Sequence, residues 1–287
     1  GGSAGAAGRR GGGEDGPAFA AVKAALEIGR PVVTANKALL AKHGVALARL
    51  AEEAGAQLGF EAAVAGGIPV IKTLREGLGS ASIAKVFGIM NGTCNYILTR
   101  MGNENISFAD CLKDAQALGY AEADPTFDVE GFDTAHKLSI LATLCFGYEI
   151  APDKIRVEGI SRITQHDIKV AAELGYKIKL LGIAQRTDEG IEQRVHPTFV
   201  PKGSAIAGVD GVMNAVALET DHVHELLMAG PGAGGPPTAS SVLSDILDIA
   251  RGTRVPPLGI PSDELLPYKA APMRAHEGGY YVRLNAK

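Results

Sequence analysis

The sequence has 287 residues, of which 46% are hydrophobic and 21% charged, and its formal net charge is -4. This length suits one large domain or two ordinary ones with a substantial buried core. The mildly acidic balance gives no reason to expect nucleic-acid binding. No apolar run approaches the ~20 residues that cross a bilayer, and the small, polar N-terminus lacks the apolar region of a signal peptide.

The cysteines argue against a disulfide framework and against a zinc site. Cys94, Cys111 and Cys145 are an odd number, and their spacing is not that of metal ligands. Proteins that rely on disulfides or on zinc carry more regular cysteine patterns. We therefore expect a protein of the reducing cytoplasm.

The first 16 residues consist largely of glycine and alanine, and we expect residues 1–16 to be flexible. Such a segment buries too little apolar surface to offset its ordering entropy. Gly11, Gly13 and Gly16 match the pattern G-x-G-x-x-G, but no strand precedes them. Since that pattern marks a phosphate-binding turn only between a strand and a helix, a flexible tail is the favoured interpretation.

From residue 17 the pattern alternates between helices and short strands. It predicts helices over residues 17–29, 45–55 and 68–78, and strands over residues 31–34 and 57–61. Proline opens the first of these helices and glycine ends it, as helix termini prefer. The alternation predicts parallel strands that are joined by crossover helices.

The rest of the chain is typical of mixed α and β structure. The predicted strands cover residues 83–90, 178–185, 192–200, 222–228 and 280–284. One predicted helix ends at residue 101, and three others cover residues 108–118, 133–146 and 240–251. A polar loop around Pro125 precedes the helix over 133–146.

A second glycine pattern, formed by Gly230, Gly232 and Gly235, has a better context than the first. An apolar stretch precedes it, and Pro236 and Pro237 can open the helix that follows. Two interpretations stay open at this point. The turn either contacts a cofactor directly, or its glycines allow close packing of the backbone.

The most informative segment is an acidic loop that leads into a helix. Five carboxylates lie between Glu122 and Asp133, and Lys137 shares a helix face with Asp133 because the two are four residues apart. A surface ion pair is the ordinary interpretation of such a pair. However, the helix beyond Lys137 is apolar on nearly all sides and is therefore predicted to be buried. Lys137 can then orient a substrate and exchange a proton, whereas His136 is predicted to be a satisfied structural histidine.

These motifs together resemble homoserine dehydrogenases. The family signature matches residues 119–137, and further motifs match in the same order at residues 33–37, 61–69, 91–97 and 232–235. The resemblance covers about residues 12–262.

The resemblance implies an α/β fold with a partial Rossmann-type parallel sheet and an α+β substrate and dimerisation domain. Residues 17–62 are then the remaining half of a nucleotide-binding domain, on which a helix over 238–252 packs back. Residues 63–229 are the substrate and dimerisation domain, and residues 253–287 are a C-terminal tail. The implied assembly is a homodimer.

The implied reaction is a reversible hydride transfer between NADPH or NADH and L-aspartate 4-semialdehyde, which gives L-homoserine for threonine, methionine and isoleucine biosynthesis. The resemblance assigns catalysis to Lys137. By the same resemblance, the substrate is held by Gly119, Glu122, Asp128 and Asp133. The nucleotide is held by Thr34, Lys37, Gly232 and Gly234, and a sodium ion by Glu61, Val64, Gly66 and Ile68. The choice between NAD and NADP stays open.

Two departures from the family pattern lead us to expect a truncated chain. The family's first strand, its pyrophosphate-binding glycine turn and about two further βα units have no counterpart before residue 12. The predicted strand over 280–284 resembles the start of a regulatory domain in longer relatives. We therefore expect exposed apolar edges and no feedback control within this chain.

Three alternatives remain at the level of sequence. Cys94 can be a nucleophile of an acylating aldehyde dehydrogenase, although no histidine lies near it in the sequence to activate it. The chain can also be an inactive remnant that folds as a dimerising substrate domain without affinity for the nucleotide. The third alternative is an unrelated α/β scaffold.

Overall fold

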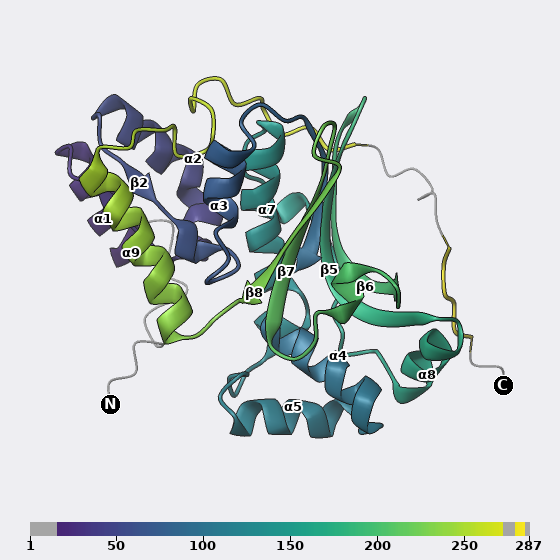
Figure 1. Ribbon diagram of the computed structural model, residues 1–287. Helices are drawn as coiled ribbons and strands as arrows, with labels where there is room; N and C mark the ends of the chain where they lie inside the picture. Colours follow the sequence, from purple (N-terminus) through teal and green to yellow (C-terminus); the bar gives the residue numbers. More distant parts are fainter. Residues whose placement is uncertain (1–15, 272–278, 285–287) are drawn as a thin grey trace.

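The computed structural model describes residues 16–271 and 279–284 (Figure 1). The predicted flexible segment and the first glycine pattern therefore fall almost wholly outside the described residues.

Helices and strands are interspersed along the part of the chain that the structure describes. The α-helices are α1 (Pro17–Glu27), α2 (Lys37–Glu53), α3 (Val70–Lys72), α4 (Gly92–Glu104), α5 (Phe108–Ala117), α6 (Thr126–Val129), α7 (Phe132–Phe146), α8 (Gln165–Glu173) and α9 (Gly235–Arg251). The 3-10 and π turns are η1 (Glu61–Ala63), η2 (Thr73–Gly77), η3 (Pro152–Lys154) and η4 (Ala205–Gly208). The strands are β1 (Val32–Val33), β2 (Leu58–Gly59), β3 (Ile83–Ile89), β4 (Arg156–Val157), β5 (Tyr176–Thr187), β6 (Gly190–Pro201), β7 (Met213–Thr220) and β8 (Glu225–Pro231).

A small parallel sheet forms one side of the molecule. Within the described residues it consists of β1 and β2, and Val32 and Val33 pair with Leu58 and Gly59. Helices α1 and α2 pack beside it, and α9 returns from the end of the chain to lie along it (Figure 1). The contact with α9 is close, because a Cβ on Gly59 would lie 2.8 Å from the Cβ of Asp245. The parallel βα pattern that the sequence predicts is confirmed.

A larger mixed sheet forms the other side. In the part of the chain that the structure describes, its order is β4-β6-β5-β3-β7-β8, and every pairing except β4 with β6 is antiparallel. Helices α4 and α7 cover one face of this sheet (Figure 1). A second cluster of apolar side chains, which includes Leu181 and Ile206, lies apart from the main core. The combined architecture is the mixed α/β fold that the sequence predicts.

Helix α7 carries the predicted lysine and is the most buried of the long helices. It begins after Gly131 and ends before Gly147, both of which have positive φ angles of 88° and 72°. Side chains such as Leu138, Ile140 and Leu141 are fully buried. The predicted buried helix over 133–146 is therefore confirmed, and its position fixes where Lys137 can point.

Several local predictions are wrong. Helix α2 begins at Lys37 instead of residue 45, and the loop around Pro125 contains the short helix α6. Helix α8 and strands β4 and β7 are additional elements, and the strand expected over 222–228 is β8, three residues later. Residues 280–284 form no strand; instead, the Tyr281 hydroxyl donates to Asp167 and the ring stacks on Phe199.

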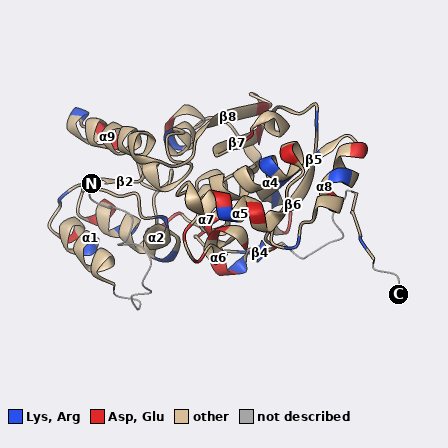
Figure 2. Ribbon diagram, turned by 90° about the horizontal axis from the view of Figure 1, so that it is seen from below, with Lys and Arg blue, Asp and Glu red and all other residues tan. Residues whose placement is uncertain are grey.

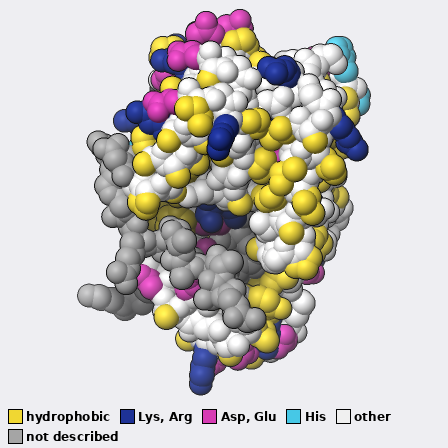
Figure 3. Space-filling view, turned by 90° about the vertical axis from the view of Figure 1, so that its left-hand side faces the viewer, with side chains coloured by type: hydrophobic (Ala, Val, Ile, Leu, Met, Phe, Trp, Pro, Cys, Tyr) yellow, Lys and Arg dark blue, Asp and Glu magenta, His cyan; other side chains and the backbone are white. Residues whose placement is uncertain are grey.

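Three apolar side chains are exposed on α9. Leu243, Ile246 and Leu247 follow one another at helical spacing and are each about half exposed. Figure 3 shows apolar side chains gathered on this side of the molecule. These side chains give α9 an exposed apolar face. None of the described helices is both long and apolar enough to cross a membrane.

Candidate active site

Lys137 lies at the centre of a cluster of charged groups near the start of α7. Its ammonium group donates to the main-chain oxygen of Met90 at 2.7 Å and to Oδ2 of Asp133 at 2.7 Å. The side chain of Lys137 is 11% exposed and that of Asp133 is 3% exposed. The expected pairing of these two residues on one helix face is confirmed, and it is a largely buried pair rather than an exposed surface one.

Lys37 reaches the same carboxylate from the other side of the molecule. Its Nζ lies 2.9 Å from Oδ1 of Asp133. Lys37 is the first residue of α2, and the side chain of Asn36 caps this helix by accepting a hydrogen bond from the Leu39 amide. Burial by itself would raise the pKa of Asp133, but the two ammonium groups outweigh burial and hold this pKa well below its ordinary value.

Asn91 connects the acidic loop to this pair. Its Nδ2 donates to Oδ2 of Asp133 and to Oδ1 of Asp128, both at 2.9 Å. Its Oδ1 accepts from the amide of Cys94 and thereby caps α4. In the sequence, an asparagine before a helix indicates only a cap, so Asn91 was missed as a site residue. The structure thus brings together Lys137, Asp133, Lys37 and Asp128.

The acidic loop places the other predicted substrate residues near the surface. Acidic residues gather around α5, α6 and α7 (Figure 2). Gly119 follows α5 with a φ of 75°, and Glu122 is exposed three residues later. Thr93 fixes this stretch to α4, since its hydroxyl donates to the main-chain oxygen of Tyr120 at 2.6 Å. Glu122 and Gly119 therefore lie on a segment that is anchored to the site but open to solvent.

The second glycine pattern forms a tight turn between β8 and α9. A Cβ on Gly66 would lie 2.4 Å from the carbonyl atoms of Gly232, and one on Gly232 would lie 2.1 Å from Cγ of Asn214. Gly234 has a φ of 107° and directly precedes α9. The glycines of this turn therefore allow close packing of the backbone, which is one of the two interpretations from the sequence. The other interpretation, contact with a nucleotide, is compatible with this packing.

Thr34 shapes the loop that precedes Lys37. Its amide donates to the main-chain oxygen of Gly59, and its Oγ1 accepts from the amide of Asn36 at 3.1 Å. Thr34 thus ties the end of β1 to the start of α2. Seen from the side of α1 and α9, the molecule has a recess with basic and acidic side chains at its floor (Figure 3).

The predicted cation-binding residues lie in one turn after β2. The two carboxylate oxygens of Glu61 accept from the amides of Ile71 and Lys72 at 2.9 Å. The main-chain oxygen of Gly66 accepts from the Ser241 hydroxyl, and that of Ile68 accepts from the Val70 amide. Burial raises the pKa of Glu61 to about 7, although the two amides oppose it. The oxygens of Glu61, Gly66 and Ile68 thus already accept a hydrogen bond, so a bound cation would be a second partner for each of them.

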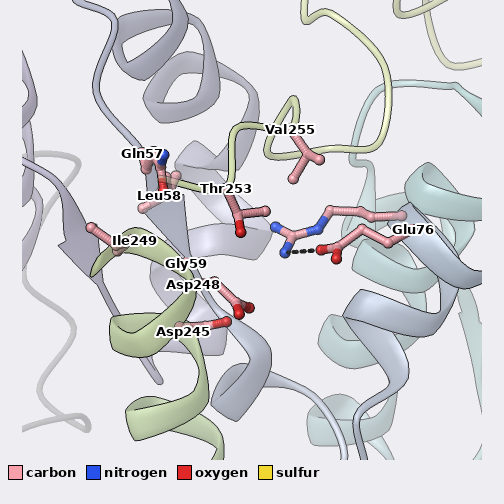
Figure 4. A pocket seen from close by; sticks show the side chains of 10 residues that line it. Gln57, Leu58, Gly59, Glu76, Asp245, Asp248, Ile249, Thr253 and Val255 are labelled. Carbon is pink, nitrogen blue, oxygen red and sulfur yellow. Dashed lines mark hydrogen bonds and ion pairs between the residues drawn. The ribbon is translucent and has the colours of Figure 1, made fainter. Parts of the chain in front are cut away.

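Two further carboxylates support this turn from α9. The Glu61 amide donates to Oδ2 of Asp245 at 2.8 Å. Asp245 and Asp248 project from one face of α9 into a small cavity of about 30 Å³ (Figure 4). Lys72 pairs with both, and burial raises the pKa of Asp245. A cavity of this size has room for a small number of water molecules beside these carboxylates.

Comparison with known proteins identifies the family of this chain. A sequence model of homoserine dehydrogenases matches residues 69–247. The homoserine dehydrogenase of Pseudomonas aeruginosa is 52% identical over 269 residues, which are 92% of this chain and 62% of that protein. The crystal structure of the Thiobacillus denitrificans enzyme superposes with a TM-score of 0.86 at 50% identity, over 89% of this chain and 61% of that one.

The chain belongs to the homoserine dehydrogenase family. It spans about 62% of the length of the Pseudomonas relative and 65% of that from Neisseria gonorrhoeae, to which it is 50% identical. A hyperthermophilic archaeal homoserine dehydrogenase, 30% identical with a TM-score of 0.73, was solved in complex with NADPH. Family membership and fold are thus established, and the unrelated scaffold is excluded.

Cys94 is unsuited to the nucleophilic role of the aldehyde dehydrogenase alternative. Its side chain is fully buried, and its Sγ lies 3.2 Å from the main-chain oxygen of Asp128. Burial and the nearby Asp128 carboxylate raise its pKa well above the ordinary value. Since a thiolate is needed for attack on an aldehyde, the thiol of this homoserine dehydrogenase family member contributes packing.

The prediction for His136 is partly wrong. The ring packs edge-on against Phe127 with centroids 5.3 Å apart, which fits a structural role. Its Nδ1, however, is buried and has no hydrogen-bond partner among the described residues. Burial lowers the pKa of His136. The neutral ring is therefore held by packing against an aromatic neighbour instead of by satisfied hydrogen bonds.

Proposed function

We propose that this protein is an NAD(P)-dependent homoserine dehydrogenase, which interconverts L-aspartate 4-semialdehyde and L-homoserine. The observation that carries this proposal is the pair of lysines, Lys137 and Lys37, on the single buried carboxylate of Asp133. Two cations from different parts of the chain meet there on one carboxylate. Such an arrangement suits a reaction in which a negative oxygen and an anionic cofactor must both be stabilised.

The residues around the glycine turn fit part of a nicotinamide nucleotide. Helix α9 has 17 residues, and no acidic residue lies in its first turn. The turn before it lacks side chains that would block a close approach to the backbone. A helix N-terminus of this kind attracts phosphate groups. Gly232 and Gly234 would hold the nucleotide at this end, and Thr34 and Lys37 would hold it across the recess.

Lys137 is the proposed proton donor and acceptor. When bound, the nicotinamide nucleotide supplies or accepts the hydride. Lys137 Nζ donates a proton to the aldehyde oxygen during reduction and takes a proton from the alcohol during oxidation. Asp133 keeps Nζ in place between its own Oδ2 and the Met90 oxygen. In each direction one proton then moves between Lys137 Nζ and the aldehyde or alcohol oxygen of the substrate.

The acidic loop would recognise the amino-acid part of the substrate. An ammonium group needs carboxylate or carbonyl partners, and the loop offers Glu122 and Asp128 with Gly119 at its start. Asn91 already orients Asp128 beside the lysine pair. We assign Asp133 to the substrate side as well, through its control of both lysines.

We further propose a sodium ion at the turn that contains Glu61, Val64, Gly66 and Ile68. Carboxylate and carbonyl oxygens are the ligands that such ions accept. Here the ion would orient the turn against Gly232 and α9, because the Gly66 carbonyl is already tied to Ser241. Among the described residues no cluster of three or more acidic, histidine or cysteine side chains suggests a different metal centre.

The wider assignments rest on family membership. We propose that residues 17–62 with α9 form the nucleotide side, that residues 63–229 form the substrate and dimerisation side, and that the active species is a homodimer. The product would enter threonine, methionine and isoleucine biosynthesis in the cytoplasm.

Steady-state oxidation of L-homoserine by the purified chain, with NADP and then NAD, tests the proposed activity. Appearance of the reduced nucleotide that depends on both substrates is the expected result. A folded chain that shows no turnover with either nucleotide would contradict the proposal for this chain, while its family membership would stand.

A further inference from the structure

Asn214 is a buried residue whose side chain lacks every hydrogen bond that it can make. It lies in β7 and is 1% exposed, yet neither Nδ2 nor Oδ1 has a partner among the described residues. Asn95 is buried to the same degree and makes the expected contacts. Its Nδ2 donates to the main-chain oxygens of Val209 and Met213, and its Oδ1 accepts from Lys179. Because an unpaired buried amide destabilises a fold, the state of Asn214 calls for a physical reason.

The position of Asn214 in the sheet places it next to the lysine site. Side chains alternate along a strand, so Asn214 shares a face with Val216, which belongs to the same core cluster as Leu138 of α7. In the register of β3 and β7, Ile89 pairs with Ala215. Met90 directly follows β3, and its main-chain oxygen binds Lys137. Asn214 therefore lies in the strand next to the one that leads into Met90, the residue whose main-chain oxygen binds Lys137.

The glycine turn covers Asn214 directly. A Cβ on Gly232 would lie 2.1 to 2.3 Å from Cγ, Nδ2 and Oδ1 of Asn214. On its other side the same turn contacts Gly66, where a Cβ would lie 2.4 Å from the Gly232 carbonyl and 2.9 Å from the Ala233 nitrogen. The backbone of the turn is thus held between a carboxamide and the backbone of the turn after β2, with no side chain in between.

We propose that Asn214 is a positioning residue for nucleotide binding, and that its carboxamide forms hydrogen bonds with the peptide groups of residues 232–234 when this turn closes on a nicotinamide nucleotide. The inference rests on the proposed use of that nucleotide. A carboxamide carries one acceptor and two donors, so it can satisfy both a peptide N–H and a peptide C=O. Since the side chain is sealed beneath Gly232, it acts on the nucleotide through the turn rather than by contact.

This arrangement gives the unpaired amide a function. In the structure neither polar atom of this buried amide has a partner among the described residues, which costs stability. Hydrogen bonds that form only with the closed turn favour that position, so the binding of the nucleotide and the closure of the turn support each other. Glycine at 232 is then required because any side chain would occupy the space of the carboxamide.

Two leucine substitutions separate this role from a merely structural one. In the absence of nucleotide, Asn214→Leu is expected to keep or raise the thermal midpoint, because it removes an unpaired polar group. The matched control Asn95→Leu is expected to lower the midpoint by at least roughly 2–4 °C, because it breaks three hydrogen bonds. If leucine does not fit beneath Gly232, Asn214→Ala removes the same amide without adding volume.

NADPH is the probe for the second half of the test. In the parent chain, NADPH should raise the thermal midpoint and slow hydrogen–deuterium exchange in a peptide that spans residues 230–236. In Asn214→Leu and Asn214→Ala, the protection of this peptide should be lost and the dissociation constant for NADPH should rise about tenfold, the size of one lost hydrogen bond.

Each other outcome overturns the inference in a recognisable way. If Asn214→Leu and Asn214→Ala destabilise the nucleotide-free chain as much as Asn95→Leu does, the amide has a fixed partner. If they bind NADPH and protect the turn as the parent does, Asn214 has no role in binding. If NADPH changes neither the thermal midpoint nor the hydrogen exchange of the parent chain, the proposed use of the nucleotide is contradicted. That result is obtained on the parent chain, before any variant is compared.

Discussion

Asp133 organises the charged groups of the site. It is almost fully buried and accepts from Lys137, Lys37 and Asn91. A carboxylate in this environment would be costly to bury alone, but two ammonium groups and an amide compensate for the lost water. The sequence predicted the partnership of Asp133 with Lys137 because both lie on one helix. The contact with Lys37 joins residues from different parts of the fold, and only the resemblance to the family indicated that both serve one site.

Replacing Asp133 should therefore lower both stability and activity. We expect Asp133→Asn to reduce the free energy of unfolding at pH 7 by roughly 1–3 kcal/mol, the range for hydrogen bonds to charged groups. The folded-state pKa of Asp133 lies below its ordinary value of 3.8, so its stabilising effect is present above about pH 4 and is lost as the pH falls further. Denaturant unfolding at pH 7 and at pH 3 measures both effects.

Asp188 supplies the control for this prediction. It lies exposed in the turn between β5 and β6, and Asp188→Asn should leave unfolding unchanged at both pH values. If Asp133→Asn and the parent differ equally at pH 7 and pH 3, the charge of Asp133 is not what stabilises the fold.

At the scale of elements, the site is built where helices begin. Helices α2, α4 and α7 start at or close to Lys37, Asn91 and Asp133, and α9 starts just after the glycine turn. The amides at these helix starts and the two lysines favour negative groups. The sheets bring these helix starts together, because β1, β3 and β8 end just before α2, α4 and α9. In this way Lys37, Asn91 and Asp133, which are far apart in the sequence, come together at one site.

The glycine turn should not tolerate a side chain at position 232. We expect Gly232→Ala to destabilise the fold by about 1–3 kcal/mol, as overpacking of a tight contact does, because its Cβ would overlap the carboxamide of Asn214. Gly235→Ala is the matched control, since a Cβ at Gly235 has no atom within 4 Å. Thermal unfolding of the two variants compares them, and equal midpoints would contradict the close packing of the turn.

Glu61 should make the turn after β2 sensitive to pH and to sodium. The pKa of Glu61 is about 7 in the fold against an ordinary value of 4.5, so its contribution to stability is fully present below about pH 4.5 and is lost as the pH rises through 7. Sodium bound to the ionised form would restore stability at pH 8 by mass action. We expect sodium chloride to raise the thermal midpoint of the parent at pH 8 more than choline chloride does at equal ionic strength.

The same comparison in Glu61→Gln provides the control. This variant lacks the ionised carboxylate, so the two salts should act alike on it. An equal sodium effect in the parent and in Glu61→Gln would remove Glu61 from the proposed cation site.

Local signals explain which elements the sequence predicted well. Helix α1 has proline at its start, and α7 is apolar on nearly all sides beyond Lys137, so the sequence predicts both. Helix α8 carries a capping box between Thr164 and Asp167, a signal that was present but not used. Strand β7 contains a continuous apolar run without alternation, and α2 contains Gly44, whose missing side chain makes room for Ile150. Elements of this kind depend on neighbours that are distant in sequence.

The candidate site likewise contains residues with a local sequence signal and residues that depend on distant neighbours. The family motifs predicted Lys137, the acidic loop, the turn after β2 and the glycine turn before α9. The structure brings Lys137, Asp133, Lys37 and Asp128 together. Asn214 and Asp245 were not predicted, because an isolated asparagine or aspartate has no motif of its own. Asn91 stands in the motif over residues 91–97, but it was not assigned to the site. Their roles depend on contacts such as that between Glu61 and Asp245, which are 184 residues apart.

At the scale of the whole molecule, we expect the chain to form a homodimer. Family membership is the basis of this expectation. Multi-angle light scattering of the purified chain should give about twice the mass of the 29.7 kDa monomer. A mass equal to one chain across a wide range of concentrations would contradict the proposed assembly, but it would leave the proposed chemistry of Lys137 untouched.

The central claim is that Lys137 transfers the proton in homoserine oxidation, and one comparison of variants tests it most directly. Initial rates with L-homoserine and NADP are measured for the parent, for Lys137→Ala and for Lys169→Ala, whose lysine is 77% exposed on α8. We expect Lys137→Ala to lower kcat at least about a hundredfold, the lower range for a general acid or base, while circular dichroism shows an intact fold and Lys169→Ala keeps the parent rate. A Lys137→Ala protein with a near-normal rate would contradict the assignment.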